Sequence, residues 1–180
     1  MKWLRWFQDY AAHPDPRTAL GNLVALLIVS NQPFYPLYVY WIAGSPAWVT
    51  LVSFLSTPFF FAVPAVARRN ALAGRILLCV TGTLNTVLCV WAIGEPSGVA
   101  LFYLPCILIG VLLFRQTELA AMAVCTGLPM LAFLVLNHKL GGPLHVFGAE
   151  QYSSLVTLHA VSVGSLIAFV GYKFSTEQKS

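Results

Sequence analysis

The chain has 180 residues, of which 58% are hydrophobic and only 9% are charged, and its mean hydropathy is +0.77. Soluble domains carry about 25% charged residues, so this composition excludes a soluble globular domain and predicts an all-α, polytopic membrane protein. The net charge of +4 does not indicate nucleic-acid binding, because the basic residues flank hydrophobic segments and form no single patch.

Residues 1–17 are predicted to form an arm that precedes the membrane domain. Four aromatic residues fall on one side of this arm at helical spacing: Trp3, Trp6, Phe7 and Tyr10. Polar and charged residues fill the other side, which predicts an interfacial amphipathic helix in the headgroup layer. The hydrophobic run is too short for a signal peptide and is interrupted by HPDPR at 13–17.

Six hydrophobic segments follow and predict a bundle of six transmembrane helices over residues 18–174, before a polar cytoplasmic tail at 175–180. Their approximate bounds are 18–43, 47–67, 72–93, 99–114, 119–136 and 153–174. The two halves of the bundle share no pattern of prolines, which weighs against an inverted-repeat transporter.

Lysine and arginine residues predict the orientation of this bundle. Nine of the ten fall on the side of the two termini, and only Lys139 falls on the other side. By the positive-inside bias, both termini are expected in the cytoplasm. Arg75, in the first turn of the third segment, is expected to snorkel to the surface and not to act as a buried charge.

The first hydrophobic segment, of about 26 residues, contains a polar break, the sequence SNQPFYPLY at 30–38. As a helix it would be about 39 Å long, whereas the hydrocarbon core is about 30 Å thick, so Asn31 and Gln32 fall near the midplane. Pro33 and Pro36 each remove a backbone hydrogen-bond donor. Other helices or a ligand must therefore satisfy the polar groups of this break.

Several polar and aromatic side chains are expected at one depth, between the midplane and the outer leaflet. They are Asn31, Gln32, Tyr35, Asn85, Tyr103 and His159. Prolines at similar depths kink helices apart, so the pattern predicts a pocket for a small lipophilic or amphiphilic ligand. For Asn85 and His159 the alternative is a hydrogen bond to a neighbouring helix.

Small residues in the last segment form a smooth stripe that is predicted to pack against another helix: Ala160, Gly164 and Ala168. Packing within the bundle is the commoner case, and a homodimer is the alternative.

The sequence predicts neither an enzyme nor a metal or cofactor site. No acidic residue lies deep in a segment, and His159 is the only histidine inside one, so a haem held by two histidines lacks its second ligand. The four cysteines form no CxxC pair and are interpreted as buried small hydrophobic residues.

Three stretches carry a resemblance to a known family: PFYPLYVYW at 33–41, LFYLP at 101–105 and LFRQTE at 113–118. In these and in its layout, the chain resembles the six-span N-terminal sensor domain of bacterial histidine kinases, including receptors for α-hydroxyketone quorum-sensing signals. Related membrane domains precede adenylate and diguanylate cyclases. The resemblance implies a sensor in the bacterial inner membrane. Because this chain ends at Ser180, either a separate kinase or cyclase is its partner or the module has another use.

Two classes of function remain. The first is a receptor module that binds a lipophilic molecule and signals to a cytoplasmic partner, and the second is an accessory or structural subunit of a larger membrane complex. A small transporter is a third alternative. Membrane lipid is an expected partner in each case, and the sequence specifies neither a ligand nor an oligomeric state.

Overall fold

The computed structural model describes residues 2–44, 46–136 and 138–177, and in these the regular structure is entirely helical. The α-helices are α1 (Lys2–Ala11), α2 (Pro16–Asn31), α3 (Tyr35–Ala43), α4 (Thr57–Arg69), α5 (Ala71–Ile93), α6 (Tyr103–Leu112), α7 (Leu119–Leu136) and α8 (Ala149–Glu177). The 3-10 helices are η1 (Gln32–Phe34), η2 (Ala47–Ser56), η3 (Glu95–Ser97), η4 (Val99–Phe102) and η5 (Gln116–Glu118). The all-α class is confirmed, while residues 178–180 of the predicted tail lie outside the described residues.

Five helical segments are long and apolar enough to cross a membrane: Pro16–Ala43, Ala47–Arg69, Ala71–Ile93, Gln116–Leu136 and Ala149–Thr176. The predicted fourth span is shorter, because the apolar helix Val99–Leu112 is only about 21 Å long against a hydrocarbon core of about 30 Å. The chain is therefore a multi-pass membrane protein, but the predicted count of six crossings is not established by helix length.

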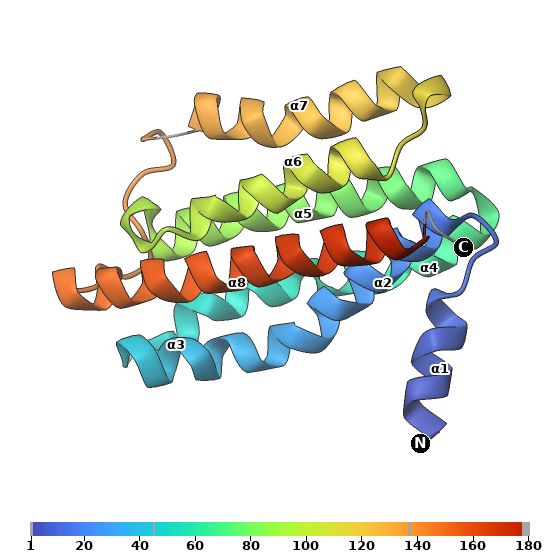
Figure 1. The fold of residues 1–180 in the computed structure, drawn as a ribbon. Helices are drawn as coiled ribbons and strands as arrows, with labels where there is room; N and C mark the ends of the chain where they lie inside the picture. The colour runs from blue at the N-terminus through green and yellow to red at the C-terminus, as the bar shows by residue number, and fades with distance from the viewer. Residues whose placement is uncertain (1, 45, 137, 178–180) are drawn as a thin grey trace.

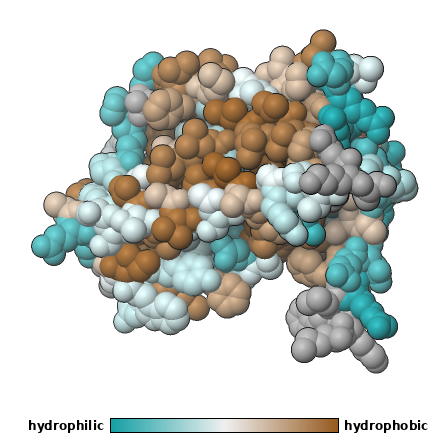
Figure 2. Space-filling model, viewed as in Figure 1, coloured by the Kyte–Doolittle hydropathy of each residue, from teal (hydrophilic) through white to brown (hydrophobic). Residues whose placement is uncertain are grey.

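The helices run roughly side by side, and both termini lie at one end of the bundle, here called the terminal end (Figure 1). The opposite end, which carries residues 94–98 and 138–148, is called the loop end. A broad hydrophobic band crosses the middle of the face seen in Figure 2, and hydrophilic residues gather at both ends. This distribution is the one expected of a bundle whose middle contacts lipid.

Residues Lys2–Ala11 form the helix α1, which lies across the long axis of the bundle (Figure 1). Its place in the headgroup layer stays a prediction. The Tyr10 ring stacks on Phe61 of α4 at 5.2 Å between ring centroids, and the Tyr10 hydroxyl donates to the Phe61 carbonyl at 2.9 Å. The Arg68 guanidinium lies over the same tyrosine ring at 4.8 Å. These contacts fix the direction of α1 relative to α4.

The helix α5 occupies the centre of the bundle, where it packs against α2, α4, α6 and α7. Glycines allow two of the closest approaches. A Cβ atom at Gly74 would lie 2.8 Å from Cα of Ala67 in α4, and one at Gly110 in α6 would lie 2.9 Å from the Cys125 carbonyl of α7. Larger residues at these positions would force the helix pairs apart.

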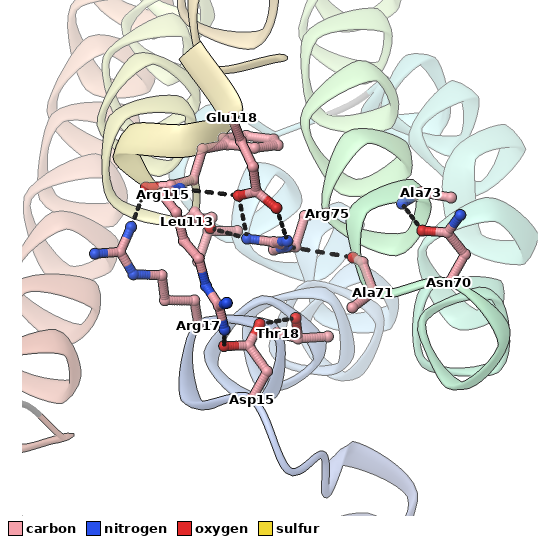
Figure 3. A network of polar contacts seen from close by, with 11 residues as sticks. Asp15, Arg17, Thr18, Asn70, Ala71, Ala73, Arg75, Leu113, Arg115 and Glu118 are labelled. Atoms are coloured by element: carbon pink, nitrogen blue, oxygen red, sulfur yellow. Dashed lines mark hydrogen bonds and ion pairs between the residues drawn. The ribbon is translucent and has the colours of Figure 1, made fainter. Parts of the chain in front are cut away.

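Arg75 is only 3% exposed, so the prediction that it snorkels to the surface is wrong. Its guanidinium donates to both carboxylate oxygens of Glu118, at 2.9 and 2.6 Å, and to the Leu113 carbonyl at 2.6 Å (Figure 3). A carboxylate and a backbone carbonyl thus replace the water that the charge would otherwise need. Arg75 ties α5 to the turn between α6 and α7.

The same end of the bundle holds a second ion pair, in which Arg115 donates to Asp15 at 2.9 Å (Figure 3). Arg17 donates to the Phe114 carbonyl, so the start of α2 is joined to the turn that also binds Arg75. Burial raises the pKa of Asp15, but hydrogen bonds from Thr18 and Arg115 outweigh it and hold this pKa below its usual value. This end is therefore held by charge pairs that persist at neutral pH.

The small-residue stripe of α8 faces outward. Ala160, Gly164 and Ala168 are exposed, and a Cβ atom at Gly164 would meet no atom within 4 Å. The expectation that this stripe packs within the bundle is therefore wrong for the described residues. Val163 and Val170 face inward instead.

The Glu118→Gln variant is expected to lose about 3 kcal/mol of stability, because it leaves the buried Arg75 guanidinium without its counter-charge. The matched control is Glu150→Gln, which changes an exposed carboxylate with no ion pair recorded among the described residues. The unfolding midpoints of both variants are measured by heating them in detergent with a thiol-reactive dye, which reports exposure of the buried cysteines. Equal unfolding midpoints would contradict the role given to this pair.

Candidate functional site

A cavity of about 760 Å³ lies within the bundle and is lined by residues of α2, η1, α3, α4, α5, η4, α6 and α8. Its wall is mostly apolar, and no charged residue belongs to the lining. Ligand pockets commonly measure roughly 300–1,000 Å³ and place a few polar groups on an apolar wall. The cavity therefore has the size and composition of a site for a small lipophilic molecule.

Four of the six residues predicted to form a pocket line this cavity: Asn31, Gln32, Tyr35 and Asn85. Three of them come from the polar break of the first span, which the structure places at η1 as the proline pattern predicts. Asn31 is exposed at the edge of the cavity, whereas the neighbouring Gln32 is buried. Ligand binding by these residues stays a prediction.

The Gln32 side chain is fully hydrogen-bonded by the second span. Its Nε2 donates to the Ser53 carbonyl at 2.8 Å and to Ser56 Oγ at 2.9 Å, and its Oε1 accepts from Thr57 Oγ1 at 2.6 Å. The bond to a carbonyl fixes which end of the amide is Nε2, since a carbonyl can only accept. The need for partners predicted from the sequence is met by other helices, and Gln32 has no hydrogen left for a ligand.

Asn85 of α5 continues the same network into the cavity. Ser56 Oγ lies 2.8 Å from Asn85 Oδ1 and 2.7 Å from the Ser53 carbonyl, but one hydroxyl hydrogen serves one acceptor at a time. That carbonyl already accepts from Gln32, and in a 3-10 helix it also accepts the N–H three residues on. The hydroxyl is therefore available to Asn85 Oδ1. Asn85 lines the cavity, and no hydrogen bond from its Nδ2 is recorded among the described residues.

His159 of α8 lies outside the cavity lining and is fully buried. Its Nδ1 lies 2.8 Å from the Ser97 carbonyl, and its Nε2 lies 2.8 Å from the Tyr35 hydroxyl. Because the carbonyl only accepts, Nδ1 carries the hydrogen and Nε2 accepts from Tyr35. His159 is thus a neutral imidazole that links α3, η3 and α8, the alternative that the sequence left open.

Tyr103 also lies outside the lining, against the prediction. It is 6% exposed, and its ring packs edge-on against Phe133 of α7 at 6.2 Å between centroids. A rotation of α6 that the sequence does not specify turns it away from the cavity.

The sequence predicts that α8 contributes His159 to the pocket, but it misses the residues of α8 that line the cavity, among them Ser162, Ser165, Leu166 and Phe169. A signal was present, because Ser162 and Leu166 follow His159 at intervals of three and seven residues, which is one helical face. Cys79, Cys89 and Cys106 also line the cavity as small apolar residues.

A family model for MASE7 matches residues 7–179, nearly the whole chain. The chain belongs to the MASE7 family of membrane-associated sensor domains. Comparison with curated proteins and with solved structures found no match. The resemblance drawn from the sequence is confirmed at the level of a membrane sensor domain, and the histidine-kinase type stays a prediction.

Replacing Gln32 in this MASE7 domain by leucine is expected to cost about 1–3 kcal/mol, because the hydroxyls of Ser56 and Thr57 lose their partner in a buried setting. Asn31→Leu, one residue earlier, is the matched control and is expected to leave the midpoint nearly unchanged, since no hydrogen bond of its side chain is recorded in the described part of the chain. The unfolding midpoints of the two variants are compared with that of the unmodified protein. A larger loss for Asn31→Leu would refute it.

Proposed function

We propose that this MASE7 domain is the receptor module of a signalling protein. A small uncharged lipophilic or amphiphilic molecule occupies the cavity, and the resulting change in helix packing is read by a cytoplasmic partner, such as a kinase or cyclase. The observation that carries the proposal is the cavity of about 760 Å³ at the polar break of the first span. Membership of a family of membrane-associated sensor domains supports the same function.

The cavity wall indicates the chemistry of the molecule. A charged ligand would enter a low-dielectric site without a counter-charge, at a large desolvation cost. Asn85 offers hydrogen-bond donors through Nδ2, so an acceptor oxygen on the ligand, from a carbonyl or a hydroxyl, would be favoured. The rest of the wall suits an alkyl or similar apolar part.

Signal transmission is assigned to α8. Its loop-end half is held by His159, whose two ring nitrogens bind α3 and η3. Its other half lines the cavity through Ser162, Leu166 and Phe169 and continues to the terminal end. Occupancy of the cavity would therefore set how closely this half packs on α2 and α6, provided that two packings of similar energy exist.

The proposed topology has six crossings, with both termini in the cytoplasm of a bacterium and α1 lying in the headgroup layer. It is supported by the position of both termini at one end of the bundle and by the crosswise direction of α1 (Figure 1). The charge bias of the sequence favours the terminal end as the cytoplasmic one.

To test topology, cysteine is introduced at Gly142, where no neighbouring atom hinders it, or at the exposed Ala12 between α1 and α2. An impermeant maleimide added to intact cells is expected to label the Gly142→Cys variant. The Ala12→Cys variant is expected to react only after the membrane is opened. The reverse pattern would overturn the orientation.

Cavity occupancy is tested with a long-chain primary alcohol that carries a photoreactive diazirine, added to the protein in phosphatidylcholine vesicles. Adducts are expected on the α5 segment 78–89, which lines the cavity, and are located by mass spectrometry. Ser162→Phe, which fills part of the cavity, should reduce these adducts about tenfold, because overpacking costs roughly 1–3 kcal/mol and a tenfold change corresponds to about 1.4 kcal/mol. Ala160→Phe, on the exposed face of α8, is the control and should leave them unchanged.

The second candidate function is that of an accessory subunit that docks on a larger membrane complex. The exposed stripe of Ala160, Gly164 and Ala168 favours it, because a surface with little side-chain relief lets another helix approach closely. Equal cavity adducts in Ser162→Phe and Ala160→Phe, or none in either, would exclude the receptor and leave this candidate.

A further inference from the structure

The exposed residues of the cavity lining come from only two short segments. The first extends from Leu27 to Phe34 at the junction of α2 and η1, and the second from Val161 to Ser165 on α8. All other lining residues are buried or half-buried. The cavity therefore opens at one place, between the polar break of the first span and the middle of α8, here called the mouth.

The mouth lies at the middle of the membrane-spanning segments. Leu27–Phe34 is at the centre of the span Pro16–Ala43, and Val161–Ser165 is at the centre of Ala149–Thr176. The centre of a span of this length lies near the bilayer midplane, far from either water layer. The mouth therefore faces hydrocarbon.

Layers of buried side chains separate the cavity from both ends of the bundle. Toward the terminal end, the layer consists of Leu20, Val24, Arg75, Leu113, Phe114 and Val170, each at most 3% exposed. Toward the loop end, it consists of Val39, Ile93, Ser97, Phe147, Leu155 and His159, also at most 3% exposed. Among the described residues, both ends of the cavity are therefore covered by buried side chains.

The loop-end layer is held in place by specific contacts. The Leu144 amide donates to the Ala92 carbonyl at 3.0 Å, which holds the 138–148 loop on the end of α5. Gly98 has a φ of 74°, and a Cβ atom at this position would lie 3.2 Å from Cα of Val156. The turn before η4 therefore packs directly against α8. Residues from three parts of the chain thus close this end.

We infer that the ligand of this domain enters and leaves sideways, from the hydrocarbon of the bilayer through the mouth, and not from the aqueous phase. The inference rests on the proposed receptor function and specifies its ligand class. The ligand is an uncharged amphiphile that dissolves in the bilayer, with an apolar part that reaches the midplane and an acceptor oxygen for Asn85. A water-soluble signal that does not partition into lipid is excluded by this geometry.

The route is tested with a probe that cannot use an aqueous entrance: phosphatidylcholine with a diazirine in the middle of one acyl chain. Its headgroup stays at the interface, so its chain can reach the cavity wall only through a sideways opening. After irradiation in vesicles of this lipid diluted into ordinary phosphatidylcholine, adducts are expected on the α5 segment 78–89 as well as on the lipid-facing surface of α7.

A bulky residue at the mouth should block this labelling. Ser165→Trp is expected to lower the α5 adducts about tenfold, relative to those on α7, because the cost of displacing an oversized side chain is of the order of that factor. Ala168→Trp is the matched control, since Ala168 is exposed on the same helix one turn on but does not line the cavity.

Each outcome separates the route from the function. Labelling of α5 by the free diazirine alcohol but not by the lipid probe, or equal labelling of Ser165→Trp and Ala168→Trp, would overturn the sideways route and leave the receptor function standing. A third result would be that the lipid probe does not label the mouth and that two copies of the chain become cross-linked there. This result would overturn the sideways route in favour of a dimer interface. No α5 adducts from either probe would overturn both proposals.

Discussion

The Gln32 amide, buried near the midplane of the first span, is the group on which the cavity depends. Lipid offers it no partner, so its three hydrogen bonds to Ser53, Ser56 and Thr57 must come from the second span. The carbonyl it uses belongs to the ten-residue 3-10 helix η2, a length at which such helices are uncommon. These bonds hold the first span against the second span at the break. They thereby fix the orientation of the cavity wall that contains Asn31 and Tyr35.

The same constraint determines which helices are neighbours elsewhere in the bundle. Apolar helices gain little from associating in lipid, so polar pairs and close packing specify the arrangement. Ser56 and Asn85 join the second span to α5, Tyr35 and His159 join the first span to α8, and Arg75 joins α5 to the turn at Glu118. Each of these bonds connects residues at least 29 positions apart, so together they define the tertiary fold.

Hydropathy and proline positions predict the break at η1 and the five helical segments long enough to span a membrane, because these features depend on local sequence alone. The rotation of each helix about its own axis is not local, and the errors come from it. Tyr103 has the right depth but faces α7, and the stripe at Gly164 faces outward although small residues suit an interior. The burial of Arg75 is not predicted for a related reason, since its partner Glu118 is 43 residues away and nothing in the intervening sequence links the two.

A cavity that opens into hydrocarbon has a consequence for selectivity. Acyl chains of the surrounding lipid compete for the apolar wall, and a hydrophobic ligand gains nothing over them from that wall alone. Discrimination must then come from the polar groups, of which Gln32 is already saturated by its own network. Asn85, together with Asn31 at the edge of the cavity, offers donors that a lipid tail cannot satisfy and an oxygen-bearing ligand can. The hydrogen bonds that hold the bundle together thus also orient the Asn85 amide, which can bind a ligand with an acceptor oxygen but not an acyl chain.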